Sequence, residues 1–215
     1  MSNEQKENNR VYIKGRIVSG FSYSHEVHGE RFYMADICTC RNSGYKDIIP
    51  LIVSEQQVDV GHDYSRRMAA VTGQLHSCYP RETDWRRLVL SVFVRKIEFW
   101  AGELEDNRND NRISLEGFLC KEPVYRKTPL GREIADIFLA VSRSCGKMDY
   151  IPCIVWGRNA ELAVRFKMGT AVNIQGRIQS REYVKWLSEE KAETRVAYEV
   201  SVSRLRMIGS AEKRL

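Results

Sequence analysis

The sequence lacks the features of a membrane protein and of the common enzyme classes. No apolar run approaches the roughly 20 residues that a membrane-spanning helix needs. The start, MSNEQKENNR, has no apolar core and no small-residue cleavage site, so we expect a solvated arm and not a secretory signal. Nucleophile-elbow, phosphate-loop, H-E-x-x-H and dinucleotide-binding motifs are absent, and the acidic residues form no paired cluster for two metals. We therefore expect a cytoplasmic protein that is not an enzyme and needs no cofactor.

Metal-binding patterns are also missing. The six cysteines include no C-x-x-C pair, and the four histidines lie in the first half without ligand-like spacing. Cys38, Cys120 and Cys153 sit among apolar residues, where cysteine behaves as a small hydrophobe. We expect buried, reduced thiols and no bound metal.

Positive charge is present in excess. The 215 residues carry 34 Lys and Arg against 28 Asp and Glu, a formal net charge of +6. With 43% hydrophobic and 29% charged residues, the composition is that of a globular protein. The charge favours a polyanionic partner such as nucleic acid.

The chain repeats itself. Residues 9–53 align without a gap with residues 111–155, and 12 of the 45 aligned positions are identical. The match resumes with GQLHS at 73–77 over GRIQS at 176–180, at a changed offset that marks a loop tolerant of insertion. The identities are mostly glycines, a proline and core-type residues, and they also include the pairs Arg41/Arg143 and Asp47/Asp149. The sequence therefore predicts two copies of one domain.

The domain boundaries follow from the repeat. The polar stretch AGELEDNRND has the composition of a linker. We expect a flexible arm at 1–8, a first copy at 9–100, a linker at 101–110, a second copy at 111–209 and a tail at 210–215.

Each copy has the pattern of a small β-barrel. In the second copy, period-two alternation and β-branched runs predict five short strands between residues 113 and 202. Apolar residues at helical spacing predict a helix over residues 158–167, stopped by Gly169. The first copy gives the same order, with its helix within residues 55–68. Five strands with one short helix between the third and fourth predict an all-β fold of two tandem OB-fold Greek-key barrels.

Four glycines fit the corners of such barrels. Gly15 corresponds to Gly117, and Gly73 corresponds to Gly176. We expect all four at strand bends.

The second copy resembles the bacterial single-stranded DNA-binding protein family. The resemblance is carried by NRISLEG at 111–117, ADIFLAVSR at 135–143, DYIPCIVWG at 149–157, GTAVNIQGRIQSREY at 169–183 and AYEVSV at 197–202. It implies single-stranded DNA held on barrel faces by stacked aromatics and basic residues. It also implies four OB-folds per particle, hence a homodimer of this chain. Family members commonly end in an acidic recruiting tail, whereas this sequence ends in the basic GSAEKRL.

The resemblance places Tyr150, Trp156 and Tyr183 at stacking positions. The first copy has Ile48 and Ser54 in place of Tyr150 and Trp156, so we expect the second copy to carry more of the stacking. Cations interleave with the aromatics, as single-strand binding without sequence preference requires. The expected DNA-binding residues are Arg41, Tyr45, Lys46, Tyr79 and Trp85 in the first copy, and Tyr125, Arg126, Lys127, Arg143, Lys147, Tyr150, Trp156, Arg158, Arg177, Arg181, Tyr183 and Trp186 in the second.

Core packing is the alternative role for each aromatic. Phe138, Phe166 and Tyr198 are expected in the core. Tyr150 and Trp156 share one parity of their strand and should share a face, opposite an apolar face made of Ile151, Cys153 and Val155. Tyr183 and Trp186 fall in or beside a charged loop, where exposure is expected.

The sequence thus predicts sequence-independent binding of single-stranded DNA, protecting it in replication, recombination or repair at the bacterial nucleoid. Two alternatives stay open. One is an RNA-binding OB protein, because OB barrels accept either polymer. The other is an assembly protein of a primosome-like or mobile-element complex, in which the first copy serves dimer contacts.

Overall fold

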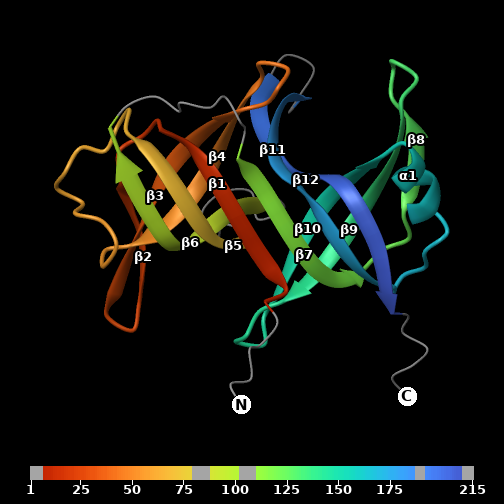
Figure 1. Ribbon diagram of the computed structural model, residues 1–215, viewed down its shortest axis with the longest axis horizontal. Helices are drawn as coiled ribbons and strands as arrows, with labels where there is room; N and C mark the ends of the chain where they lie inside the picture. The colour runs from red at the N-terminus through yellow and green to blue at the C-terminus, as the bar shows by residue number, and fades with distance from the viewer. Residues whose placement is uncertain (1–6, 79–87, 102–109, 187–191, 210–215) are drawn as a thin grey trace. The chain divides into compact units, whose positions relative to one another are not determined.

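A computed structural model describes residues 7–78, 88–101, 110–186 and 192–209, and each copy is built almost wholly of β-strands (Figure 1). The first copy contains β1 (Asn9–Ile17), β2 (Ser22–Val27), β3 (Glu30–Cys40), β4 (Lys46–Ser54), β5 (Met68–Cys78) and β6 (Val89–Trp100). The second contains β7 (Asn111–Leu119), β8 (Val124–Lys127), β9 (Glu133–Ser142), β10 (Met148–Trp156), α1 (Arg158–Ala163), β11 (Ala171–Trp186) and β12 (Ala192–Gly209).

The two copies have the same strand topology. The first runs in the order β2-β3-β4-β6-β5-β1 and closes through pairing of β1 with β3. The second runs β7-β11-β12-β10-β9-β8 and closes through pairing of β7 with β9. In each copy one parallel pair completes the barrel, β4 with β6 and β10 with β12. This is the Greek-key barrel of the OB-fold, so the predicted all-β tandem fold is confirmed.

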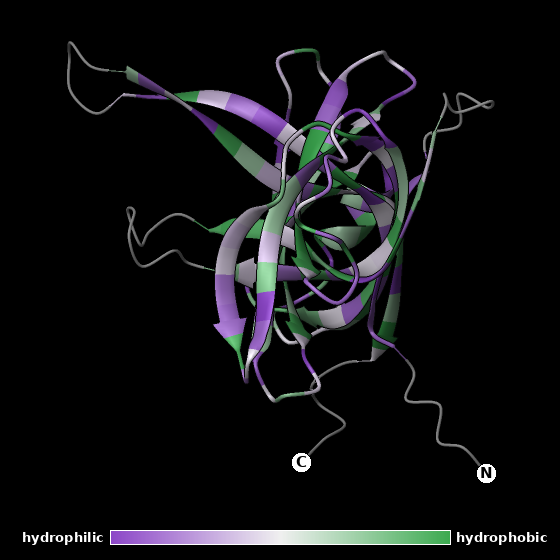
Figure 2. Cartoon of the chain, turned by 90° about the vertical axis from the view of Figure 1, so that its left-hand side faces the viewer, coloured by the Kyte–Doolittle hydropathy of each residue, from purple (hydrophilic) through white to green (hydrophobic). Residues whose placement is uncertain are grey.

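Alternating burial along the strands builds each core. Along β4, Ile49, Leu51 and Val53 are buried, and along β10 the equivalent Ile151, Cys153 and Val155 are buried. The strands in Figure 2 accordingly alternate between hydrophobic and hydrophilic residues. The predicted inward parity of β10 is confirmed.

The paired glycines are required by the close approach of a neighbouring strand. A Cβ added to Gly15 would overlap the carbonyl oxygen of Cys38, and one added to Gly117 would overlap that of Ala140. Gly73 also lies at a register shift between β5 and β6. Only glycine allows the backbones to approach this closely.

The helix predicted within residues 55–68 is wrong. Residues 55–67 form turns, in which Asp59 Oδ1 accepts the Gly61 N–H at 3.0 Å and Asp63 Oδ1 accepts the Ser65 N–H at 2.8 Å. Such side-chain acceptors compete with the helical hydrogen bonds of the backbone.

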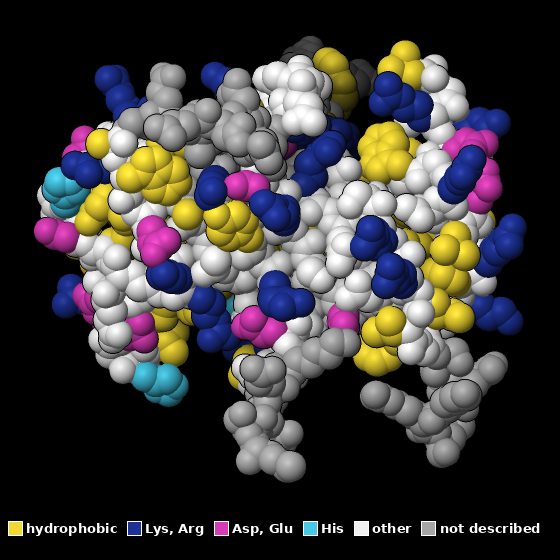
Figure 3. All heavy atoms as spheres, viewed as in Figure 1, with side chains coloured by type: hydrophobic (Ala, Val, Ile, Leu, Met, Phe, Trp, Pro, Cys, Tyr) yellow, Lys and Arg dark blue, Asp and Glu magenta, His cyan; other side chains and the backbone are white. Residues whose placement is uncertain are grey.

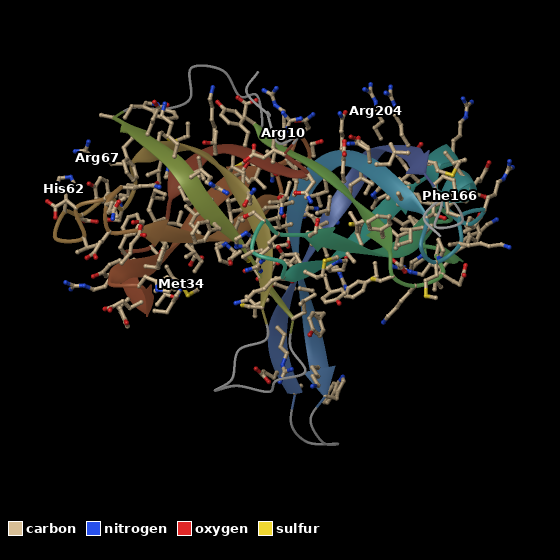
Figure 4. All side chains as sticks on the ribbon, turned by 90° about the horizontal axis from the view of Figure 1, so that it is seen from below. Arg10, Met34, His62, Arg67, Phe166 and Arg204 are labelled. Atoms are coloured by element: carbon tan, nitrogen blue, oxygen red, sulfur yellow. The ribbon has the colours of Figure 1, made fainter. Side chains whose placement is uncertain are left out.

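The second copy keeps its helix, but α1 is shorter than the predicted 158–167 and ends at Ala163. Phe166, labelled in Figure 4, follows it in a turn and is buried, as expected for a core residue.

Each copy has one strand more than predicted. β2 and β8 lie where only a loop was expected, and each pairs as an edge strand with the strand that follows it. The charged segment expected as a loop from 186 to 193 is shorter at both ends, because β11 reaches Trp186 and β12 begins at Ala192.

Contacts within the chain define two compact units whose limits differ from those of the copies. One unit holds residues 1–11, 112–177 and 200–215, and the other holds residues 12–111 and 178–199. The C-terminal part of β11 and the N-terminal part of β12, within residues 178–199, therefore group with the first copy. The boundaries at 9–100 and 111–209 stay a prediction about the repeat.

No disulfide joins the cysteines in the described ranges, and their burial differs from the expectation. Cys153 is buried, Cys38 and Cys120 are half-buried, and Cys40, Cys78 and Cys145 are exposed. Within those ranges no group of three or more His, Cys, Asp or Glu could hold a metal ion. No helix there is long and apolar enough to cross a membrane.

Candidate nucleic-acid interface

A duplicated ion pair closes the turn between β3 and β4 in the first copy and the turn between β9 and β10 in the second. Gly44 and Gly146 take positive φ values of 80° and 78°, which shapes the two turns alike. Arg41 Nε then donates to Asp47 Oδ2 at 2.7 Å, and Arg143 Nε donates to Asp149 Oδ2 at 2.7 Å. In both pairs a second hydrogen bond from Nη2 reaches the other carboxylate oxygen.

The pair in the first copy has a third partner. Asp47 Oδ1 accepts the backbone N–H of Ser180 at 2.7 Å and its hydroxyl at 3.2 Å, while Arg41 Nη2 donates to the Ser180 carbonyl at 3.0 Å. The hydrogen bond to Asp47 raises the pKa of Arg41. Arg41 and Arg143 thus direct their charge at buried carboxylates. A role for them in contacting DNA stays a prediction.

An aromatic pair lies on the outer face of the second barrel. Tyr150 is 39% exposed, and its ring stacks on Phe138 with 6.3 Å between centroids and 13° between planes. Lys121 Nζ lies 5.1 Å from the centroid of Phe138. A cation beside a stacked pair combines the two groups that bind a single strand, one for phosphate and one for bases.

Phe138 was expected in the core, and that expectation is wrong. It is half-buried and pairs with Pro152, so it shares the outward face with Tyr150. The signal was in the sequence: Asp136, Phe138 and Ser142 alternate with apolar residues along β9, which gives Phe138 the outward parity.

Two further aromatics share this face. Phe118 is 40% exposed and pairs with Ala140, which in turn pairs with Tyr150. Trp156 is half-buried, and its indole Nε1 donates to Ser201 Oγ at 3.1 Å. We call Phe118, Phe138 and Tyr150 the aromatic platform. Phe118 was missed although the parity of β7 gives the same signal, because it alternates with buried residues and shares its face with Arg112, Ser114 and Glu116.

The cations expected on β8 are paired with carboxylates. Arg126 forms a bidentate pair with Asp136, and Lys127 Nζ lies 3.9 Å from Glu133. A hydrogen bond to Glu133 raises the pKa of Tyr125. All three predicted residues of β8 are exposed, with the charges of the two cations locally balanced.

The outer end of β11 carries a second exposed group. The Arg181 guanidinium lies 5.8 Å from the Tyr183 ring centroid, and Trp186 is 67% exposed. Tyr183 belongs to a strand, not a loop, and is half-buried. Figure 3 shows Lys and Arg side chains interleaved with hydrophobic ones on the face in view.

The remaining predicted residues are exposed or lie outside the described residues. Lys46, Lys147, Arg158 and Arg177 are exposed. Tyr45 is exposed and lies 4.5 Å from the Arg41 guanidinium. Tyr79 and Trp85 lie outside the described residues.

The second copy matches a known protein family. The model described as "Single-strand binding protein family" covers residues 110–208. We call residues 110–208, which are similar to that family, the family domain. A stretch of 80 residues is 41% identical to single-stranded DNA-binding protein 2 of Listeria innocua and 39% identical to single-stranded DNA-binding protein A of Bacillus subtilis. Each alignment covers 34% of this chain, and 50% and 46% of those relatives, so the chain spans about half the length of the curated relatives that it matches.

The fold of the whole chain also has a solved counterpart. The wild-type single-stranded DNA binding protein of Thermus aquaticus superimposes with a TM-score of 0.73 over 94% of each chain, at 17% identity. A deletion mutant of the same protein gives a TM-score of 0.67. The likeness shows that the family domain and the copy before it form a known tandem fold.

Proposed function

We propose that this chain binds single-stranded DNA without sequence preference and performs no chemistry on it. The observation that carries the proposal is the aromatic platform beside Lys121, on the outer face of the family domain. Stacking on aromatic rings tolerates any base, because every base has a π-face, and each stacked base contributes about 1–3 kcal/mol. Coating of this kind suits protection of single strands in replication, recombination or repair in the bacterial cytoplasm.

The affinity for a single strand should have an electrostatic component, which salt weakens, and a stacking component, which salt leaves largely unchanged. Lys121 and the exposed cations Lys147, Arg158 and Arg177 supply a phosphate component. That component weakens with salt at a slope of about −0.7 per neutralised phosphate on a log–log plot. The stacking component on Phe138 and Tyr150 persists at high salt.

The test is a titration of intrinsic tryptophan fluorescence with oligo-dT at low and high salt, with duplex DNA as competitor. Trp156 lies on the same outer face as the platform and Trp186 is exposed, so a stacked strand should quench the signal. Quenching that survives duplex competitor supports the proposal. Oligo-rU of equal length distinguishes an RNA-binding protein, which would bind rU at least as tightly.

Two variants assign the binding to the platform. Phe138→Leu keeps apolar volume but removes the ring against which Tyr150 stacks, and Tyr150→Ala removes the exposed ring itself. Each should weaken binding about 5- to 150-fold, the equivalent of one stacked base. Tyr150→Phe keeps the ring and should bind like the wild type. An absence of quenching, or binding lost entirely to duplex, would contradict the proposal and favour an assembly protein.

We also propose that two chains associate into a particle with four OB-folds. The tandem fold supports this, since each chain supplies two barrels. Light scattering coupled to size-exclusion chromatography should return twice the chain mass of 24.9 kDa. A mass equal to one chain would refute the homodimer.

A further inference from the structure

The first copy places an aromatic ring where the second copy has Trp156, but it supplies that ring from the neighbouring strand. Trp156 on β10 pairs with Ile134 on β9. The equivalent pair in the first copy is Ser54 on β4 with Phe32 on β3. In both copies one residue of the pair is a large aromatic and the other is smaller. The aromatic comes from β10 in the second copy but from β3 in the first. In the alignment of the two copies Ser54 simply replaces Trp156, so the ring supplied by Phe32 is overlooked.

A residue of the next strand on this face, β12 in the second copy and β6 in the first, is also replaced by an aromatic in the first copy. In the second copy Trp156 donates to Ser201, which pairs with Ile154. In the first copy the residue paired with Ile52 is Phe93. Phe93 packs on Phe32 with 5.4 Å between ring centroids. The serine that accepts the indole N–H is therefore replaced by a second ring.

Two histidines extend this pair into a row of four rings. His25 on β2 stacks on Phe32 at 5.1 Å and 13°, and His76 on β5 stacks on Phe93 at 5.1 Å and 21°. Phe32 is only 7% exposed, Phe93 and His76 are half-buried, and His25 is exposed. We call His25, Phe32, Phe93 and His76 the ring row. All four belong to one compact unit.

Positive charge borders the ring row. Arg95 is exposed, and its Nη2 donates at 3.1 Å to Gln74, the residue that pairs with Phe93. Arg31 precedes Phe32 and is exposed, although its guanidinium lies 3.4 Å from Glu55. Each of these two cations thus lies on a strand that carries a ring of the row, Arg95 on β6 and Arg31 on β3.

We infer that the ring row is a second base-stacking surface for single-stranded DNA, so that the first copy binds nucleic acid through residues different from those of the family domain. The inference rests on the proposed function. Its occupant is argued from the repeat, because Phe32 occupies the cross-strand pair equivalent to that of Trp156, on a barrel of the same topology. Stacked rings with exposed surface accept any base.

The four histidines of the chain make a direct test possible. His25 and His76 belong to the row, whereas His28 lies at the β2–β3 turn and His62, labelled in Figure 4, lies in the loop between β4 and β5. The full chain, labelled with ¹³C and ¹⁵N on histidine, is titrated with oligo-dT of about 35 nucleotides, long enough for two OB-folds. The ring resonances of His25 and His76 should move at saturation while those of His28 and His62 stay in place.

Variants give an independent readout. His25→Ala and His76→Ala remove partly or fully exposed rings at the two ends of the row, and together they should weaken binding of this oligonucleotide about 5-fold or more. His62→Ala removes a ring that contacts only Tyr64 among the described aromatic pairs, and it should bind like the wild type. The proportion of folded protein is checked by thermal unfolding for each variant.

The outcomes separate this inference from the proposed function. If oligo-dT quenches tryptophan fluorescence but leaves all four histidine rings unmoved, the family domain binds and the ring row does not. If His25→Ala with His76→Ala binds like the wild type, the inference is refuted as well. If the wild type shows no quenching at all, the proposed function itself has failed.

Discussion

Replacing Asp47 with alanine should destabilise the chain far more than replacing a carboxylate in an exposed ion pair. The Asp47 side chain is 1% exposed and accepts hydrogen bonds from Arg41 and from both the backbone and the hydroxyl of Ser180. Removing one partner of a buried ion pair costs about 3–5 kcal/mol, because the other charge is left uncompensated. The Arg41 side chain is 21% exposed and can partly reach water, so we expect about 3 kcal/mol.

The matched control is Asp136→Ala. Asp136 also forms a bidentate pair with an arginine, Arg126, but the two side chains are 42% and 50% exposed. Exposed pairs contribute about 0.2–1 kcal/mol. The two substitutions thus differ mainly in burial.

Urea unfolding followed by far-UV circular dichroism measures the difference. With a slope of about 2 kcal/mol per molar urea, Asp47→Ala should lower the transition midpoint by about 1.5 M and Asp136→Ala by less than about 0.5 M. Equal shifts would refute the reasoning. Replacing both partners, Arg41→Met with Asp47→Leu, should recover much of the loss, since an apolar pair leaves no buried charge.

Other consequences of the structure can be tested separately. Gly117→Ala should cost about 1–3 kcal/mol or more, because its Cβ would overlap the Ala140 carbonyl, whereas Gly20→Ala, with open space around it, should be nearly neutral in the same unfolding assay. Burial raises the pKa of Asp36 in the folded chain above its ordinary value of 3.8. Ionisation of Asp36 therefore opposes folding, and the folded chain loses stability as pH rises from the ordinary pKa through the raised one. Asp36→Asn should therefore stabilise the chain at pH 7 and lose its advantage near pH 3.5, and an equal effect at both pH values would exclude this cause. Trp186→Ala should change stability by less than about 0.5 kcal/mol because the ring is exposed, yet weaken oligo-dT binding about 5-fold or more, and unchanged binding would place that ring outside the interface.

The barrels could be predicted because their signals are local or repeated. Period-two alternation identified most of the strands, and the gapless repeat transferred the pattern to the weaker copy. The helix in residues 55–68 failed because Asp59 and Asp63 hydrogen-bond to backbone two residues ahead. Burial of the ion-paired Asp47 could not be predicted, since it depends on Ser180, which lies 133 positions away.

The candidate site was predicted in part. Tyr150 could be placed by strand parity, and the same argument applied to β9 would have placed Phe138 beside it. The ring row could not be found this way. Phe32 and Phe93 come from strands whose neighbours depend on barrel closure and on a parallel pairing, and neither is encoded in a short window of sequence.

The exchanged ring at the Phe32/Ser54 and Ile134/Trp156 pairs also bears on how the duplicated gene can change. Recombination between its two halves that joined β3 of the first copy to β10 of the second would set Phe32 against Trp156 and overfill the pair. The reciprocal crossover would set Ile134 against Ser54 and leave it underfilled. Each copy can therefore accept a strand from the other without changing the volume at this pair only if the paired neighbouring strand is exchanged with it.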